Sequence, residues 1–351
     1  MNSIKAIEGY FVETKESLIF DVKGVLHPMD RIIAFVRYYP SPKGTRIRNG
    51  IRFSKIYKLN DRFEFLKKHY PHYLFPNHYN GNFLQGIFHK DIKKIYNPTE
   101  TVQRLLTKPT LSNLEKESMS FVETLSEGTS NNSIGISGSL MVGLHTRKSD
   151  MDIVVYGMDA SYKVHKCLTE LMDERKHNVR PMTIDELQDL HFFRNQQTES
   201  AFSTFVQLEK RKHISGMYNN REFFMRFVKT PSEIDEKYED CRYKKVGFAV
   251  VKGRVADDSE AIFTPCKYLL EDTKTIDGVQ VKDIREIISF RGRFCEQAQK
   301  GETIVACGKI EKVIRKDGTE WYQMVLGERR DDYFMPIKFF KPKPKPIGVI
   351  S

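Results

Sequence analysis

Two aspartates, Asp150 and Asp152, lie two residues apart at the start of a run that is apolar over residues 153–156. The apolar run predicts a buried strand, and strand side chains alternate between faces, so both carboxylates should point the same way. Neighbouring carboxylates repel each other unless a cation lies between them. Hard oxygen ligands suit Mg²⁺, which also keeps waters and binds the phosphates of a substrate. The pair therefore predicts a platform for metal ions.

A second motif precedes the aspartates by ten residues. Residues 134–139 predict a buried strand that ends in a Gly138-Ser139 turn, and residues 140–144 predict the start of a short helix. A helix that begins after such a turn offers free backbone N–H groups to phosphate. A phosphate cradle beside a metal platform is what phosphoryl or nucleotidyl transfer requires. The alternative is an ordinary strand–helix–strand segment with a solvated aspartate pair, which the buried character of residues 153–156 disfavours.

Gly138-Ser139, a gap of ten residues and then Asp150-x-Asp152 resemble the signature of the DNA polymerase beta-like nucleotidyltransferase superfamily. The whole chain is also similar to an archaeal family of predicted nucleotidyltransferases. The resemblance implies that the aspartates hold two Mg²⁺ ions and that the Gly-Ser turn holds the terminal phosphates of an NTP. It also implies a third carboxylate on a later strand. Glu222 is the candidate, and its alternative role is an exposed glutamate at a strand end.

Two cations, Arg147 and Lys148, occupy the loop directly before Asp150. They could steady the triphosphate of a bound nucleotide. The alternative is that both are solvated loop cations with no ligand.

Positive charge is concentrated in the first third of the chain. The formal net charge is +11, and residues 1–110 contain 19 lysines and arginines against nine acidic residues. A part of the chain with this bias attracts polyanions, of which nucleic acid is the commonest. Solubility is the alternative explanation.

Aromatic and basic residues interleave between residues 67 and 96. Such side chains can stack on bases while cations hold the phosphates. The alternative is that the aromatic rings pack a proline-bent loop. The candidate nucleic-acid contacts are Lys67, Lys68, Tyr73, Tyr79, Lys90, Lys93 and Lys94.

The pattern of elements predicts an α+β protein in four parts. Residues 1–110 should form a small basic β-rich domain, with strands near residues 10–14, 17–22, 31–39 and 46–58. For residues 111–235 the resemblance implies a polymerase beta-like nucleotidyltransferase core, a mixed sheet with helices. Residues 236–338 predict a β-barrel, OB-like or of a related kind, with a strand at 261–264 and a hairpin at Asp317-Gly318. Residues 339–351 form a Lys/Pro tail.

The five cysteines form no Cys-x-x-Cys pair, which predicts free thiols in a reducing compartment. No apolar run reaches eighteen residues, and the first residues do not resemble a signal peptide. We therefore expect a cytoplasmic protein that does not span a membrane. No Cys/His cluster has the spacing of zinc ligands.

Together these features predict an enzyme that transfers a nucleoside monophosphate from ATP or another NTP to an acceptor hydroxyl. The basic first domain and the barrel favour RNA as the acceptor. A second hypothesis is a nucleic-acid-binding protein whose nucleotidyltransferase domain is an inactive scaffold. A third keeps the chemistry but makes the acceptor a protein hydroxyl. The intact aspartate pair argues against the second hypothesis, and the basic domain argues against the third.

Overall fold

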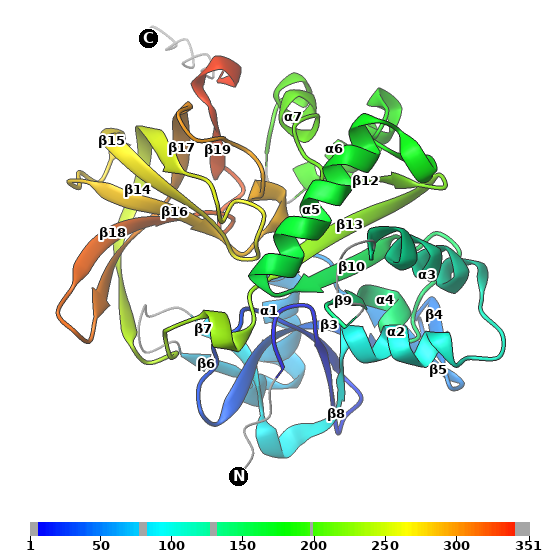
Figure 1. Cartoon of the computed structure of the whole chain (residues 1–351). Coiled ribbons are helices and arrows are strands. Elements are labelled where there is room, and N and C mark those ends of the chain that lie inside the picture. Colours follow the sequence, from blue (N-terminus) through cyan, green and yellow to red (C-terminus); the bar gives the residue numbers. More distant parts are fainter. Residues whose placement is uncertain (1–5, 77–82, 127–131, 197–198, 341–351) are drawn as a thin grey trace, which may run out of the picture.

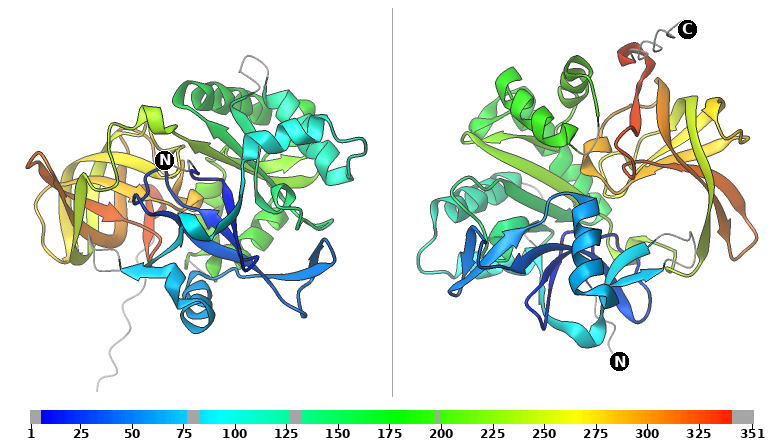
Figure 2. Two further views of the ribbon diagram at one scale, coloured as in Figure 1. Left: turned by 90° about the horizontal axis from the view of Figure 1, so that it is seen from below. Right: turned by 180° about the vertical axis from the view of Figure 1, so that it is seen from behind.

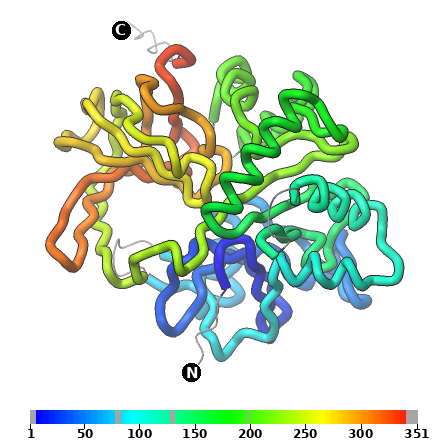
Figure 3. The backbone as a smooth tube through the Cα atoms, in the orientation of Figure 1, coloured from blue at the N-terminus to red at the C-terminus, as the bar shows by residue number. Residues whose placement is uncertain are grey.

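The computed structural model describes residues 6–76, 83–126, 132–196 and 199–340. These residues form seven α-helices and three β-sheets, so the expected α+β class is confirmed (Figure 1). The chain builds the three sheet regions one after another, from the first sheet near the N-terminus to the third near the C-terminus (Figure 3). No helix among the described residues combines the length and the apolar character needed to cross a bilayer.

The first sheet has the strand order β4-β5-β3-β2-β1-β8, and β7 joins it through β3 and carries β6. Helix α1 (Leu59–His69) packs on one of its faces (Figure 2), and Leu66 shares a buried core with Phe20 and Val36. The strands are β1 (Phe11–Thr14), β2 (Ile19–Val22), β3 (Arg31–Pro40), β4 (Arg46–Arg48), β5 (Ile51–Lys55), β6 (Leu74–Pro76), β7 (Phe83–Phe88) and β8 (Ile92–Tyr96).

Two segments of this sheet differ from expectation. The sequence predicted one extended segment over residues 46–58, but β4 and β5 form a hairpin that turns at Asn49-Gly50. Both turn residues have positive φ, +50° and +76°, as a tight hairpin turn between twisted strands requires. Farther along the chain, residues 74–76 and 83–96 supply strands β6 to β8 where a bent aromatic loop was one interpretation.

The second sheet is mixed, with the order β11-β12-β13-β10-β9. Strands β10 and β13 are parallel, and the other neighbours are antiparallel. The strands are β9 (Ile134–Ile136), β10 (Met151–Tyr156), β11 (Val179–Arg180), β12 (Ser215–Tyr218) and β13 (Arg221–Val228). The helices are α2 (Pro98–Leu106), α3 (Asn113–Leu125), α4 (Gly138–Met141), α5 (Met158–Asp173), α6 (Ile184–Asn195) and α7 (Phe202–Glu209).

The two faces of the second sheet have different partners. Alternation along β10 directs Ile153 and Val155 into a core with helices α2, α3 and α5. The opposite face carries Val154 and Tyr156, which pack against Ile7 at the start of the chain. The first sheet therefore covers the face of β10 to which Asp152 belongs.

A buried ion pair joins the first sheet region to the second sheet on this face. Glu8 is fully buried, and its Oε1 lies 3.0 Å from Lys23 Nζ and 3.1 Å from Arg226 Nη1 of β13. Its Oε2 accepts a hydrogen bond from the backbone N–H of Gly24 at 2.7 Å. These contacts fix how the two regions are oriented.

The third sheet is barrel-like, because its strand order β14-β15-β16-β18-β17 returns to β14 through the β14–β17 pairing. Strand β19 extends it beside β17. The hairpin expected at Asp317-Gly318 is confirmed, since Val313 of β17 pairs with Trp321 of β18 across that turn. The strands are β14 (Cys241–Asp257), β15 (Cys266–Gly278), β16 (Ile284–Ser289), β17 (Thr303–Arg315), β18 (Glu320–Val325) and β19 (Tyr333–Pro336).

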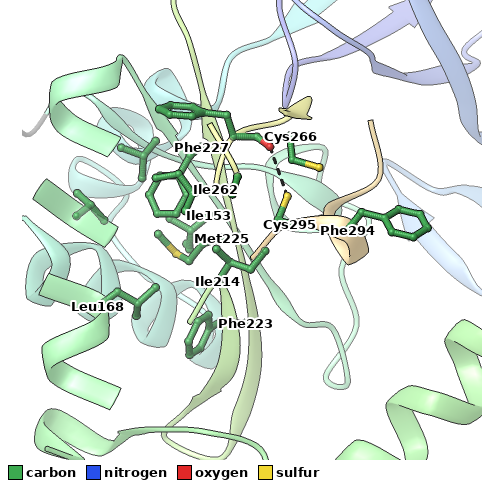
Figure 4. Packing of buried hydrophobic residues seen from close by; sticks show 14 of the residues in the cluster. Ile153, Leu168, Ile214, Phe223, Met225, Phe227, Ile262, Cys266, Phe294 and Cys295 are labelled. Carbon is green, nitrogen blue, oxygen red and sulfur yellow. Dashed lines mark hydrogen bonds between the residues drawn. The ribbon is translucent and has the colours of Figure 1, made fainter. Parts of the chain in front are cut away.

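The strand expected at residues 261–264 is wrong. These residues form a turn, in which Phe263 makes an isolated bridge to Phe227 of β13. The segment is apolar because it packs against the second sheet. There Ile262, Cys266 and Cys295 join the core that contains Phe227 (Figure 4). The second and third sheets thus share one hydrophobic core.

Candidate active site

Three carboxylates come together at one end of the second sheet. Met151 of β10 pairs with Phe223 of β13, so the preceding residues Asp150 and Glu222 lie side by side on parallel strands. Asp152 follows on the same face of β10. Within the described part of the chain, none of the three carboxylates accepts a hydrogen bond or forms an ion pair. The structure thus brings all three of the expected catalytic residues together without a direct ion pair to any described residue.

The electrostatics of this group follow from burial and mutual repulsion. Burial, and after it the charge of Asp150, raises the pKa of Asp152 from 3.8 to about 6. The same two causes raise the pKa of Glu222 from 4.5 to about 7. Glu222 is therefore about half protonated near pH 7, whereas Asp152 takes up its proton mainly below pH 6.

The Gly138-Ser139 turn lies against the Asp152 carboxylate. Gly138 has a φ of +63°, and a Cβ atom built on it would lie 1.9 Å from Asp152 Oδ2. The backbone N–H of Ser137 donates to the carbonyl oxygen of Asp152 at 2.8 Å, which fixes the turn on β10. Only glycine allows this close approach.

The Ser139 hydroxyl braces the loop that follows the turn. Ser139 is buried, and its Oγ donates to Ser149 Oγ at 3.2 Å. Ser149 Oγ also accepts from the backbone N–H of Thr146 at 2.9 Å. The observed contact of the Ser139 hydroxyl thus holds the loop directly before Asp150. A role for the same hydroxyl in binding phosphate stays a prediction.

Arg147 and Lys148 are exposed and line a cavity of about 330 Å³ together with Asp150 and Glu222. Arg221 fixes this loop, because its Nη1 donates to the carbonyl oxygens of Arg147 and Ser149 at 3.0 and 2.9 Å. The structure therefore places both expected cations on the Glu222 side of the carboxylate group.

The first sheet brings further cations to the opposite side of the carboxylates. Burial and the charge of Arg37 bring the pKa of Lys55 down to about 8, against the opposing charges of Asp150 and Asp152. No ion pair or hydrogen bond of the Lys55 ammonium group is found among the described residues. Sequence reasoning identified this basic segment but did not connect it to the aspartates, because only the tertiary packing of the two sheets does so.

The carboxylate oxygens fit a hard divalent cation such as Mg²⁺ by their chemistry. Their ligand atoms do not all lie within 4.8 Å of one another. Within the described part of the chain, the ligand atoms of His165, His213 and Glu296 do lie this close together. The spacing of these three residues in the sequence did not indicate the cluster.

The His165–His213–Glu296 cluster is explained by its own hydrogen bonds. His165 Nε2 lies 2.6 Å from Glu296 Oε1, and Oε2 accepts from the backbone N–H groups of His213 and Ile214 at 2.9 and 3.0 Å. Despite burial, these donors lower the pKa of Glu296 to about 2, and Glu296 raises that of His213. The cluster ties the barrel to the second sheet.

The expected nucleic-acid contacts have different surroundings. Tyr73 is fully buried and its hydroxyl donates to Glu16 Oε2 at 2.8 Å, so its ring packs in the first core and offers no face to a base. Tyr79 lies outside the described residues. Lys67, Lys68, Lys90, Lys93 and Lys94 are exposed, and Lys93 Nζ lies 3.1 Å from Glu13 Oε1.

Comparison with known proteins gives one informative match. The chain is 31% identical over 338 residues to the uncharacterized protein MJ1086 of Methanocaldococcus jannaschii, an alignment that covers 93% of this chain and 97% of that protein. No protein-family model matches the chain. No solved structure matches it.

Proposed function

This chain belongs to one family with the archaeal protein MJ1086, and we propose that it is a metal-dependent nucleotidyltransferase of the DNA polymerase beta-like superfamily. It transfers a nucleoside monophosphate from an NTP to an acceptor hydroxyl and releases pyrophosphate. RNA is the proposed acceptor, and the cytoplasm the proposed location.

The observation that carries the proposal is the group of Asp150, Asp152 and Glu222, three neighbouring carboxylates that form no ion pair with any described residue, beside the Gly138 turn. A structural role would leave the partly buried carboxylates of Asp152 and Glu222 paired, as that of Glu296 is. The raised pKa values of Asp152 and Glu222 are typical of functional sites. The mixed sheet with parallel β10 and β13, and helix α4 between β9 and β10, is compatible with the proposed polymerase beta-like core.

Each part of the site has a role in the reaction. Asp150 and Asp152 would hold Mg²⁺, which supplies a Lewis acid that lowers the pKa of the acceptor hydroxyl and neutralises the triphosphate. Glu222, with a pKa near 7, accepts the proton of that hydroxyl. The hydroxyl oxygen bonds to the α-phosphorus as the bond from that phosphorus to the bridging oxygen breaks, and pyrophosphate leaves.

Cations on both sides of the carboxylates can contact phosphate. Arg147 and Lys148 lie on the Glu222 side, and Lys55 and Arg37 lie on the side of the first sheet. The Gly138 turn adds backbone N–H groups at Asp152. Phosphates can thus be bound while the reacting α-phosphorus stays at the aspartates.

The third sheet supports RNA as the acceptor. Its closed strand order, with β16 parallel to β18, is consistent with an OB-like barrel. Barrels of that kind bind single-stranded nucleic acids through a positively charged groove and stacking side chains. The basic residues of the first 110 positions add to this attraction.

The test is a transfer assay in which each of four NTPs, labelled at the α-phosphate, is incubated with the protein, Mg²⁺ and either total RNA or total protein. We expect label on RNA with wild type and none with Asp150→Asn. Label on protein would support the protein-acceptor hypothesis. RNA binding without any label transfer would support the inactive scaffold.

A further inference from the structure

A cavity of about 510 Å³ lies between the first sheet region and helix α6. Its walls come from strands β3 and β5 with the start of α1 on one side, and from the last turn of α6 on the other. The two sides are far apart in the sequence, so the cavity exists only in the assembled fold. It does not overlap the smaller cavity at Glu222.

The walls of this cavity are aromatic and unusually exposed. Tyr57 and Phe193 retain 43% and 47% exposure, and their ring centroids are 6.0 Å apart in an edge-to-face arrangement. Tyr39 and Phe65, with centroids 4.5 Å apart, line the wall beside them. Exposed rings facing a cavity are costly to leave in water and suit a flat aromatic ligand.

The cavity is connected to the carboxylates through Lys55. This residue lines the cavity, and it also lies within the electrostatic field of Asp150 and Asp152. A ligand with an aromatic ring against Phe193 and a phosphate at Lys55 would therefore reach the aspartates. Asp61 and Gln196 line the same cavity and offer hydrogen-bonding groups to the edge of a base.

The positions of the two cavities separate the two substrates. The cavity at Glu222 contains the residue that accepts the acceptor's proton, so the acceptor approaches from that side. The cavity with Lys55 is left for the nucleotide that donates its α-phosphate.

We propose that the cavity formed by Tyr57, Phe193 and Lys55 binds the nucleobase of the incoming NTP, with the triphosphate directed past Lys55 to Asp150 and Asp152. This inference rests on the proposed function and adds the location of the base. The base stacks on the exposed ring of Phe193 or Tyr57.

The test is calorimetric titration of the full chain with ATP, GTP, CTP and UTP in the presence of Ca²⁺, and with inorganic tripolyphosphate as a probe that has no base. Phe193→Ala should weaken binding of the preferred NTP about tenfold or more, as loss of a stacked base does, and leave tripolyphosphate affinity unchanged. Phe193→Tyr should restore affinity. Lys55→Gln should weaken both ligands.

The matched control is Phe192→Ala. Phe192 is the neighbouring residue on α6, is 75% exposed and does not line the cavity. Its removal should leave NTP affinity unchanged. Melting temperatures of all variants separate loss of binding from loss of folding.

Three outcomes overturn the inference: no NTP binds to wild type, Phe193→Ala binds the NTP as wild type does, or Phe193→Ala weakens RNA binding instead. Transfer measured in parallel separates the inference from the proposed function. If wild type transfers label and Phe193→Ala keeps the same KM for NTP, the base site is wrong and the function stands. If NTP binding depends on Phe193 and no acceptor is labelled, the base site stands and the function is wrong.

Discussion

Gly138 and Asp152 are packed so closely that a Cβ atom on the glycine would lie 1.9 Å from the Oδ2 of the aspartate. Gly138→Ala should therefore displace the Asp152 carboxylate and lower transfer activity at least about 100-fold. Gly143→Ala is the control, because Gly143 also has positive φ, +69°, but its nearest neighbour, Arg48 Cδ, would be 3.5 Å away. Both variants carry the cost of the left-handed backbone, about 1 kcal/mol. Equal activities of the two variants would show that the contact with Asp152 is unimportant.

Mg²⁺ or Mn²⁺ should raise the melting temperature by several degrees at pH 8, since an ion that binds only the folded state stabilises it. At pH 5 the shift should vanish, because protons occupy Asp152 and Glu222 below their pKa values of about 6 and 7. Scanning calorimetry of wild type and Asp152→Asn checks this, and the variant should show no shift at either pH.

Glu296→Gln distinguishes the two groups of candidate ligands. Its side chain belongs to the His165–His213–Glu296 cluster and is not part of the carboxylate group. We expect this variant to keep the metal-dependent shift. A shift that disappears in Glu296→Gln and persists in Asp152→Asn would move the metal site to that cluster.

Without metal, the contribution of Asp152 and Glu222 to the free energy of unfolding should fall as pH rises from about 4 to about 7. In this range the folded protein keeps protons on Asp152 and Glu222 that the unfolded chain has already released, so rising pH favours unfolding. The raised pKa of His213 acts in the same direction, whereas burial lowers the pKa values of His27 and His145, which act in the opposite direction in wild type and variant alike. Urea unfolding of wild type and Asp152→Asn in chelator isolates the aspartate, and the variant should lose less stability. If the unfolding free energies of wild type and Asp152→Asn changed in parallel with pH, the raised pKa assigned to Asp152 would be contradicted.

The logarithm of the RNA-binding constant should fall linearly with the logarithm of the salt concentration. For a single strand, each phosphate contact should add about 0.7 to the steepness of this slope. Replacing Lys67, Lys68, Lys90, Lys93 and Lys94 by Gln should flatten the slope. Replacing Lys163 and Lys166, exposed on α5, should not. If the five-lysine variant binds RNA with the wild-type slope, the RNA surface lies elsewhere, and the barrel is the next region to test.

Sequence reasoning predicted what depends on short stretches of chain. The strand–turn–helix–strand at residues 134–156 was predictable because the glycine turn and the alternation around Asp152 are local signals. The β17–β18 hairpin was predictable because Asp317-Gly318 allows few other turns. The Asn49-Gly50 hairpin carried an equally strong signal but was read as part of one strand.

Features that depend on packing between distant segments were not predictable in this way. The apolar residues 261–264 resemble a strand, yet they are apolar because they pack on β13. Tyr73 resembles a stacking residue but fills the core beneath β2, where it meets Phe20. Lys55 faces the aspartates only because the first sheet folds over that face of β10. No sequence pattern within one segment of the chain indicates which distant segment will pack against it.

The most direct test of the proposed chemistry compares ATP, or the preferred NTP, labelled at the α-phosphate with the same nucleotide labelled at the γ-phosphate, incubated with RNA and Mg²⁺. The account predicts that wild type transfers the α-label to RNA and releases the γ-label as pyrophosphate. Asp150→Asn and Asp152→Asn, folded as judged by melting temperature, should do neither. Transfer of the γ-label to an acceptor, or transfer by the aspartate variants at the wild-type rate, would contradict it.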